Sequence, residues 1–218
     1  LLLQGGAEVI YTGTEATTDN ELNGGRYEQL DFMSDQSVEG FTERVIVAAP
    51  HIDILVNNSG INVNQPIDEI SDENWDAILR INLTGAMKMS RSVARTMKQN
   101  GKGGKIVNIS SIWGIISKSK RNAYSAAKTG LIGLTKASAL DLAPYGILVN
   151  ALCPGFVNTE LTSHMLSKEE MSQLASEVPL GRFAEVDDIA RVVAFLCSEW
   201  NTYITGQSIV VDGGFTIR

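Results

Sequence analysis

Short apolar segments alternate with longer helical ones along the whole chain, and this alternation limits the possible folds more than any other feature. Six segments rich in apolar and β-branched residues are predicted strands, at residues 8–12, 27–31, 52–57, 105–110, 147–152 and 208–212. Helical patterns occupy residues 37–49, 72–100, 122–143, 168–176 and 186–198. Strands that alternate with helices form a parallel sheet covered on both faces, so we expect a doubly wound α/β fold with three layers, α/β/α.

Length and composition restrict the class of protein. The 218 residues contain no repeat, linker or low-complexity segment, so we expect one domain over residues 1–218. The net charge of −7 disfavours a nucleic-acid partner, which clustered Lys and Arg would bind. The sequence has neither a long apolar run nor a basic leader, so we expect a cytoplasmic protein without a membrane partner. Cys153 and Cys197 lie in apolar runs and are expected to be buried thiols, and no metal site is expected.

The first six residues, Leu-Leu-Leu-Gln-Gly-Gly, have the pattern of a helix end stopped by glycine. A nucleotide-binding sheet would then have the strand order 3-2-1-4-5-6-7, with strand 1 absent from this sequence. That strand would lie between the segments 8–12 and 52–57, whose edges would be unpaired without it. We therefore expect upstream residues to supply it in the working protein. The alternative is a sheet that closes in an unusual way.

A tyrosine and a lysine mark the first candidate for chemistry. Tyr124 and Lys128 are four residues apart in a predicted helix, which places them on one face, one above the other. A positive charge beside a phenol favours the phenolate, so we expect Lys128 to lower the pKa of Tyr124 and to make it a better acid or base. The same spacing also occurs in exposed, solvated pairs, and spacing alone does not separate the two interpretations.

Ser111 strengthens the catalytic interpretation because it ends a predicted strand thirteen residues before the tyrosine. Open α/β sheets bind their ligands at the carboxyl ends of the strands. A hydroxyl at that edge can donate to a carbonyl oxygen, and with the phenol it would form a two-donor site for a developing oxyanion. A serine that only ends a strand in a turn is the ordinary alternative.

With these residues in place, the sequence resembles the classical short-chain dehydrogenase/reductase family, and within it the 3-oxoacyl-[acyl-carrier-protein] reductases. The resemblance runs along the whole chain and rests on five motifs in the right order. Besides Ser111 with Tyr124-x-x-x-Lys128, these are Asn57-Asn58-Ser59-Gly60, Asn82 in Ile81-Asn82-Leu83, Pro154-Gly155 with Val157 and Thr159, and Ile204-Thr205-Gly206-Gln207 with Val211-Asp212-Gly213-Gly214.

The resemblance implies a Rossmann-like sheet and a role for each matching residue. Tyr124 would be the proton donor in reduction, Ser111 would orient the carbonyl, and Lys128 would hold the nicotinamide ribose and tune the phenol. Asn82 would complete the catalytic tetrad by positioning a water in the proton relay. The remaining cofactor contacts implied are Asp31 at the adenine with Phe32 beside it, Asn57, Ser59 and Gly60 after a strand, and Pro154, Gly155, Val157 and Thr159 around the carboxamide.

The cofactor is predicted to be NADP, with NAD as the alternative. The family's Thr-Gly-x-x-x-Gly-x-Gly turn, which brings backbone amides to the pyrophosphate, does not occur in this sequence. The choice of cofactor depends on the end of the strand at 8–12, where an acidic residue would accept from the ribose hydroxyls of NAD. Thr14 is the expected contact there and tolerates a phosphate, although Glu15 follows it directly.

The expected substrate is a small molecule with a carbonyl or a secondary alcohol, and a 3-oxoacyl thioester is one candidate. Tyr145 stands where carrier-protein reductases of the family often have a basic residue, which counts against a carrier-protein substrate. The basic segment Lys118-Ser119-Lys120-Arg121 directly precedes the catalytic tyrosine. It is interpreted either as a site that attracts an anionic substrate or as a solvated loop. The alternative function is a non-catalytic family member that serves as a structural or binding subunit.

Two further expectations concern motion and assembly. Residues 158–178 are polar with few apolar anchors and are predicted to form a mobile lid over the substrate. The helices at 72–100 and 122–143 resemble the pair that family members bury against a symmetry mate, so a homodimer or homotetramer is expected. Candidates for that face, or equally for the core, are Met87, Met89, Val93 and Leu134.

Overall fold

The structure is a computed structural model that describes residues 1–18, 24–49, 51–159, 162 and 167–218. Its strands are β1 (Ile10–Gly13), β2 (Arg26–Gln29), β3 (Ile54–Asn57), β4 (Gly104–Ile109), β5 (Ile147–Pro154) and β6 (Ser208–Val211). Its α-helices are α1 (Asp35–Phe41), α2 (Asp72–Leu79), α3 (Ala86–Asn100), α4 (Asn122–Leu142), α6 (Lys168–Ser176) and α7 (Val186–Cys197). Each predicted strand and helix therefore has a counterpart, with ends that shift by a few residues.

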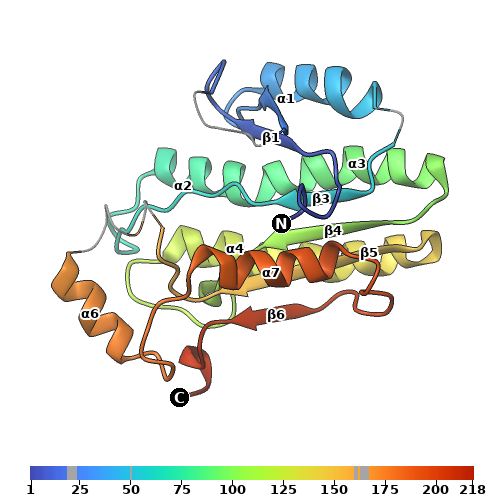
Figure 1. The fold of residues 1–218 in the computed structure, drawn as a ribbon. Helices are drawn as coiled ribbons and strands as arrows, with labels where there is room; N and C mark the ends of the chain where they lie inside the picture. The colour runs from blue at the N-terminus through green and yellow to red at the C-terminus, as the bar shows by residue number, and fades with distance from the viewer. Residues whose placement is uncertain (19–23, 50, 160–161, 163–166) are drawn as a thin grey trace.

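The strands form two parallel sheets, and the order within them is the predicted one (Figure 1). One sheet pairs β1 with β2, and the other has the order β3-β4-β5-β6. Within the described residues no pairing joins β1 to β3, which are the two strands predicted to flank the absent one. The apolar side chains of Ile10 and Tyr11 on β1 are 40% and 39% exposed, so the described residues leave this strand incompletely covered.

Helices cover both faces of the larger sheet, which makes the fold a three-layer, Rossmann-like α/β/α arrangement (Figure 1). Leu55, Ile106 and Val149 point to the face that α1, α3 and α4 cover, and they share a cluster with Met97 of α3. Ile54, Val56 and Val107 point to the opposite face, where they pack against residues of α7 such as Leu196. Apolar residues on both faces explain why these strands are apolar almost throughout.

The long helix predicted at 72–100 is interrupted by a π-helical turn. The segment η2 (Arg80–Gly85) joins α2 to α3 directly, and a second π-helical segment, η1 (Thr42–Val47), continues α1. The π-turn inserts an extra residue into a helix and is common at functional sites. Asn82 lies inside η2 and is almost completely buried.

The chain starts with the hydrogen bonds of a helix end. The amide of Ala7 donates to the carbonyl of Leu2 at 3.1 Å, and that of Gly6 donates to Leu3 at 2.9 Å. Gly6 has a φ of 86°, in the left-handed region, so this is the glycine-stopped turn that the sequence predicted. Leu2 packs against the cluster beneath α7.

The candidate interface residues separate into two groups. Met89 and Val93 are 3% and 2% exposed and belong to the core, so packing and not assembly explains them. Met87 and Leu134 are only partly buried and stay candidates. Cys153 and Cys197 are free and buried, as predicted. Among the described helices, none is long and apolar enough to span a bilayer.

The predicted lid falls partly outside the described residues, because the structure does not describe 160, 161 or 163–166. What it does describe is α6, which begins at Ser167 with a reciprocal cap in which Ser167 and Glu170 bond to each other's main chain. Before it, Asn158 donates its amide to Ala184 at 2.8 Å. The mobility of the segment stays a prediction.

Candidate active site

Tyr124 and Lys128 lie in the first two turns of α4, where the helix starts beside the carboxyl end of β4. Lys128 is 3% exposed, and its Nζ donates to the carbonyl oxygen of Ile109, the last residue of β4, at 2.7 Å. The same Nζ lies 5.6 Å from the centroid of the Tyr124 ring. Lys128 is therefore buried and Tyr124 is partly buried, which excludes the interpretation as an exposed, solvated pair.

Ser111 lies between the strand and the tyrosine. It follows β4, is 7% exposed, and accepts a hydrogen bond from the amide of Trp113 at 3.2 Å as the cap of the short helix η3 (Ile112–Gly114). The neighbouring Ser110 donates to the main-chain oxygen of Lys128 at 2.9 Å and so fixes the strand end to α4. The Ser111 hydroxyl lies close enough to the phenol of Tyr124 to act on it and lower its pKa. The structure thus brings the hydroxyl and the phenol together, as the two-donor site requires.

Burial sets the protonation of both groups. It raises the pKa of Tyr124, while the nearby hydroxyl of Ser111 and the charge of Arg121 act in the opposite direction and are weaker. Burial also lowers the pKa of Lys128 to about 8, against a smaller raising effect of Cys153. The prediction that Lys128 lowers the pKa of Tyr124 is therefore wrong for the protein alone: desolvation dominates, and the cation that acts on the phenol is Arg121. At neutral pH the phenol carries its proton.

Asn82 completes the group from the π-turn η2. Its Oδ1 accepts from the amide of Ile61 and its Nδ2 donates to the carbonyl of Ile61, both at 2.8 Å. Gly60 lies between the asparagine and the lysine, because a Cβ there would lie 3.4 Å from Lys128 Nζ and 3.5 Å from Asn82 Oδ1. The four predicted catalytic residues are therefore gathered at one place, with the loop after β3 bound to Asn82.

Polar groups suited to a cofactor follow β1, β2 and β3. Thr14 after β1 is exposed, and its main-chain oxygen accepts from Gln29 at 2.8 Å. Asp31 after β2 is partly buried and uses Oδ1 to accept from the amide of Met33 at 2.8 Å. Ser59 after β3 is exposed. All three lie at the carboxyl edge, where a dinucleotide would bind.

Two predicted cofactor residues turn their side chains into the fold instead. The ring of Phe32 is 9% exposed and packs in the core against Gly85, where a Cβ would lie 2.7 Å from the ring. The amide of Asn57 donates to Ser90 at 3.0 Å and to Asn108 at 2.7 Å. A cofactor would meet these two residues through their main chain.

Asn57 belongs to a chain of buried polar groups that crosses from β3 to α4. Asn108, which receives the bond from Asn57, donates in turn to the hydroxyl of Thr135 at 2.9 Å. Thr135 then donates to the carbonyl of Leu131 at 2.8 Å. Both Asn108 and Thr135 are at most 1% exposed, so water does not reach them. The hydrogen bonds within this chain satisfy their buried polar groups instead.

The residues predicted for the carboxamide follow β5. Pro154 is buried at the end of the strand, and the amide of Gly155 donates to Val211 at 2.9 Å. A Cβ on Gly155 would lie 2.8 Å from the backbone of Asp212. The segments after β5 and β6 therefore approach so closely that only glycine fits at position 155. Val157 forms a bridge with Ala184. Thr159 Oγ1 lies 3.0 Å from the hydroxyl of Thr162.

The ammonium donors of Lys128 fit the ribose of a nicotinamide nucleotide. An ammonium group has three donors, and one of them bonds to Ile109. A buried cation with further donors next to Tyr124 suits the hydroxyls of a ribose. Among the described residues, no three His, Cys, Asp or Glu side chains gather as a metal site would require.

Sequence reasoning missed an aromatic wall beside the tyrosine. Trp113 contacts Phe156 and Phe215 edge-on, each with ring centroids 6.2 Å apart, and Phe156 stacks on Phe183 at 5.1 Å. Tyr124 packs against this cluster. The signal was present in the sequence, since Trp113, Phe156 and Phe215 each come a few residues after a strand ends, but their contacts depend on the tertiary fold.

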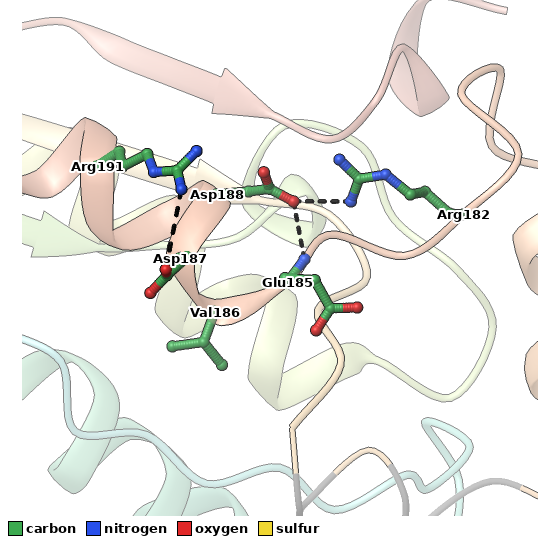
Figure 2. A pocket seen from close by; sticks show the side chains of 6 residues that line it. All are labelled: Arg182, Glu185, Val186, Asp187, Asp188 and Arg191. Atoms are coloured by element: carbon green, nitrogen blue, oxygen red, sulfur yellow. Dashed lines mark hydrogen bonds and ion pairs between the residues drawn. The ribbon is translucent and has the colours of Figure 1, made fainter.

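A surface hollow at the start of α7 contains none of the predicted catalytic or cofactor-binding residues (Figure 2). It is lined by Arg182, Glu185, Val186, Asp187, Asp188 and Arg191. Arg182 and Asp188 pair at 2.7 Å, and Asp188 also caps the amide of Glu185 at 2.9 Å (Figure 2). These charges satisfy one another and serve the helix start, so the hollow is not our candidate active site.

Comparison with known proteins decides the family. The family model described as "Enoyl-(Acyl carrier protein) reductase" matches residues 1–216. A 3-oxoacyl-[acyl-carrier-protein] reductase of Aquifex aeolicus is 38% identical over 222 residues, which cover 98% of this chain and 89% of the relative. This chain belongs to the short-chain dehydrogenase/reductase family. Members of this family are NAD(P)-dependent oxidoreductases.

Solved structures of short-chain dehydrogenases/reductases agree with the fold. A gluconate 5-dehydrogenase from Burkholderia cenocepacia, in complex with NADP and tartrate, has a TM-score of 0.83 and 33% identity, and the match covers 89% of this chain and 76% of that one. A 4-hydroxyisoleucine dehydrogenase mutant, complexed with NADH and succinate, has a TM-score of 0.92 and 30% identity, with 100% and 91% covered. The two structural neighbours thus hold different nicotinamide cofactors.

Proposed function

We propose that this chain transfers a hydride between NADP(H) and a carbonyl or secondary alcohol, with Asn82, Ser111, Tyr124 and Lys128 as its catalytic group. The observation that carries the proposal is the partly buried phenol of Tyr124, which lies beside the Ser111 hydroxyl and has the Lys128 ammonium 5.6 Å from its ring centroid. A protonated phenol beside a hydroxyl is what protonation of a developing alkoxide needs. We further propose that the protein works in the cytoplasm as a homodimer or homotetramer.

In the reducing direction, bound NADPH supplies the hydride that goes to the carbonyl carbon. Tyr124 gives its proton to the carbonyl oxygen as the C–O double bond becomes a single bond, so the products are the alcohol and NADP⁺. Ser111 donates to the same oxygen and holds it near the phenol. The donors of the Lys128 ammonium that do not bond to Ile109 hold the ribose.

The proton lost by Tyr124 must be replaced from solvent. Both polar groups of the Asn82 side chain bond to Ile61, so Asn82 keeps the loop after β3 in place. One N–H and one oxygen lone pair of the carboxamide remain for a water of the proton relay.

The preference for NADP rests on the end of β1. Thr14 is exposed and neutral there, which leaves space for a 2′-phosphate, and its main-chain oxygen is already bonded to Gln29. Glu15 is also exposed and would favour NAD if it reached the ribose. Since the structural neighbours hold NADP in one case and NADH in the other, both cofactors belong in the test.

The reacting group of the substrate is a ketone or a secondary alcohol. Two classes of substrate that carry such a group are candidates. Similarity to a 3-oxoacyl-[acyl-carrier-protein] reductase favours a 3-oxoacyl thioester. Similarity to dehydrogenases named for gluconate and 4-hydroxyisoleucine favours a hydroxy acid, and their structures hold the dicarboxylates tartrate and succinate. The aromatic wall around Trp113 suits the carbon chain of either class.

Replacement of Tyr124 by phenylalanine tests the proposal, because it removes the proton donor and keeps the ring. Turnover with NADPH and a ketone panel should fall by at least about a hundredfold, the contribution of one general acid, while circular dichroism stays unchanged. Titration with NADPH and NADH by nicotinamide fluorescence should show binding to both the native and the variant protein. Failure of both cofactors to bind would favour the non-catalytic alternative, and unchanged turnover in the variant would exclude Tyr124 from the reaction.

A further inference from the structure

The guanidinium of Arg121 is a second charged group at the active site that the proposed reaction does not use. Arg121 is the residue that caps α4, three positions before Tyr124 and therefore on the same side of the helix start. Its charge acts on Tyr124 electrostatically. The side chain is half-buried, unlike Lys118 and Lys120, which are exposed in the same basic segment.

Arg121 is held in place by its surroundings. Its guanidinium carbon lies 5.9 Å from the centroid of Trp113, within the range of a cation–π contact, and its backbone forms a bridge with Gln65. The residue before it, Lys120, has a φ of 68°, and the amide of Gln65 donates to Lys120 at 3.1 Å. A bulky residue in the left-handed region is strained, and such strain clusters at binding sites.

The described part of the chain gives Arg121 no carboxylate partner within ion-pair distance. Arg91 and Arg95 also lack such a partner, but both are exposed to solvent, whereas Arg121 is half-buried. Other arginines, such as Arg80 and Arg182, lie within 3 Å of a carboxylate oxygen. The chain carries 25 acidic and 18 basic residues, so acidic groups are not scarce. Burial lowers the pKa of Arg121, and the effect of Tyr124, which raises it, is the smaller of the two.

We propose that Arg121 binds a carboxylate of the substrate, so that the preferred substrates are oxo acids or hydroxy acids that react as free anions. This inference rests on the proposed function, since Tyr124 marks where the reacting carbonyl lies. The planar fork of Arg121 matches a carboxylate in a bidentate manner, and Trp113 supports it from one side. Arg121 is therefore a specificity-determining residue, and a neutral thioester would leave it unpaired.

Matched acids and esters test the proposal, because both carry the same ketone and differ in charge. The pairs are 3-oxobutanoate with methyl 3-oxobutanoate and 4-oxopentanoate with its methyl ester, each measured with the full chain and NADPH. The acid should have the higher kcat/KM in at least one pair. In Arg121→Gln the ratio of kcat/KM for acid to that for ester should fall by at least about tenfold, the loss expected for a charged hydrogen bond, and Arg121→Lys should recover part of it.

The control is Lys118→Gln, which removes the same charge from the exposed part of the same loop. Its acid-to-ester ratio should stay within about twofold of the native value, and the Arg121 effect should persist at high salt, where exposed charges are screened. Equal use of acids and esters by the native protein, or an unchanged ratio in Arg121→Gln, would overturn the inference and leave the proposed function standing. Unfolding of both Arg121 variants, seen by circular dichroism, would assign the residue to structure and overturn it as well. If no acid or ester is reduced at all, the proposed function itself fails.

Discussion

Lys128 is expected to cost the folded protein stability at neutral pH, and the cost should disappear in alkali. Its pKa falls from the ordinary value of 10.5 to about 8 because burial disfavours the charged form. Below pH 8 the lysine is charged in both the folded and the unfolded chain, so the folded state carries the full desolvation penalty. Between pH 8 and 10.5 the folded protein releases the proton first, and stability rises with pH.

The expected size follows from these two pKa values. Between pH 7 and pH 9.5 the linkage relation gives the native protein a gain of about 2 kcal/mol relative to a variant that lacks the ionisable group. Lys128→Met is that variant. It also loses the bond from Nζ to Ile109, but this loss is independent of pH and cancels when the two pH values are compared.

Urea unfolding of both proteins at the two pH values is the assay. The difference between their midpoints should change by about 1 M, in favour of the native protein at the higher pH, for a typical dependence on urea. Lys136→Met, at an exposed position on the same helix, provides the baseline for pH effects of the whole chain. A difference between native and Lys128→Met that is constant with pH would refute the desolvation of Lys128, and with it our account of how burial sets the charges of the site.

Three further predictions concern packing and assembly. Phe32→Ala should destabilise the fold by about 3–5 kcal/mol, as for a core aromatic residue, whereas a small loss of stability with a large loss of NADPH affinity would make the ring a cofactor contact instead. Gly155→Ala should cost about 1–3 kcal/mol by overpacking against Asp212, while Gly133→Ala, with open space around it, should not destabilise; equal thermal midpoints for the two would contradict the close approach. Sedimentation at micromolar concentration should show a dimer or tetramer, and Leu134→Glu should shift it toward the monomer; a monomeric native chain would refute the predicted assembly.

The residues that sequence reasoning placed well are those whose position follows from chain order and period. Tyr124 and Lys128 had to share a helix face, and Ser111 had to stand at a strand end, so the tetrad could be anticipated from the pattern together with the family resemblance. The order of the strands followed from the same rules. These features need no knowledge of side-chain packing.

The sequence failed where packing decides. The π-turn that holds Asn82 leaves the helical period almost unchanged, so the segment 72–100 gave no sign of it. The inward ring of Phe32 depends on the space above Gly85. Likewise, the pKa of Tyr124 depends on how deeply the ring is buried, and this outweighs the neighbouring lysine that the sequence displays.

The buried bond between Asn57 and Asn108 has a consequence for how the larger sheet finds its alignment. The two residues are partners in the pairing of β3 with β4, and their neighbours on the same face, Leu55 and Ile106, are apolar. A slip of two residues would keep apolar side chains on their proper face, so hydrophobic burial alone discriminates poorly against it. Such a slip would leave at least one buried amide without a partner, at a cost of about 1–3 kcal/mol. The polar pair therefore fixes the register of β3 against β4, and with it the relative position of the strand ends that carry the active site.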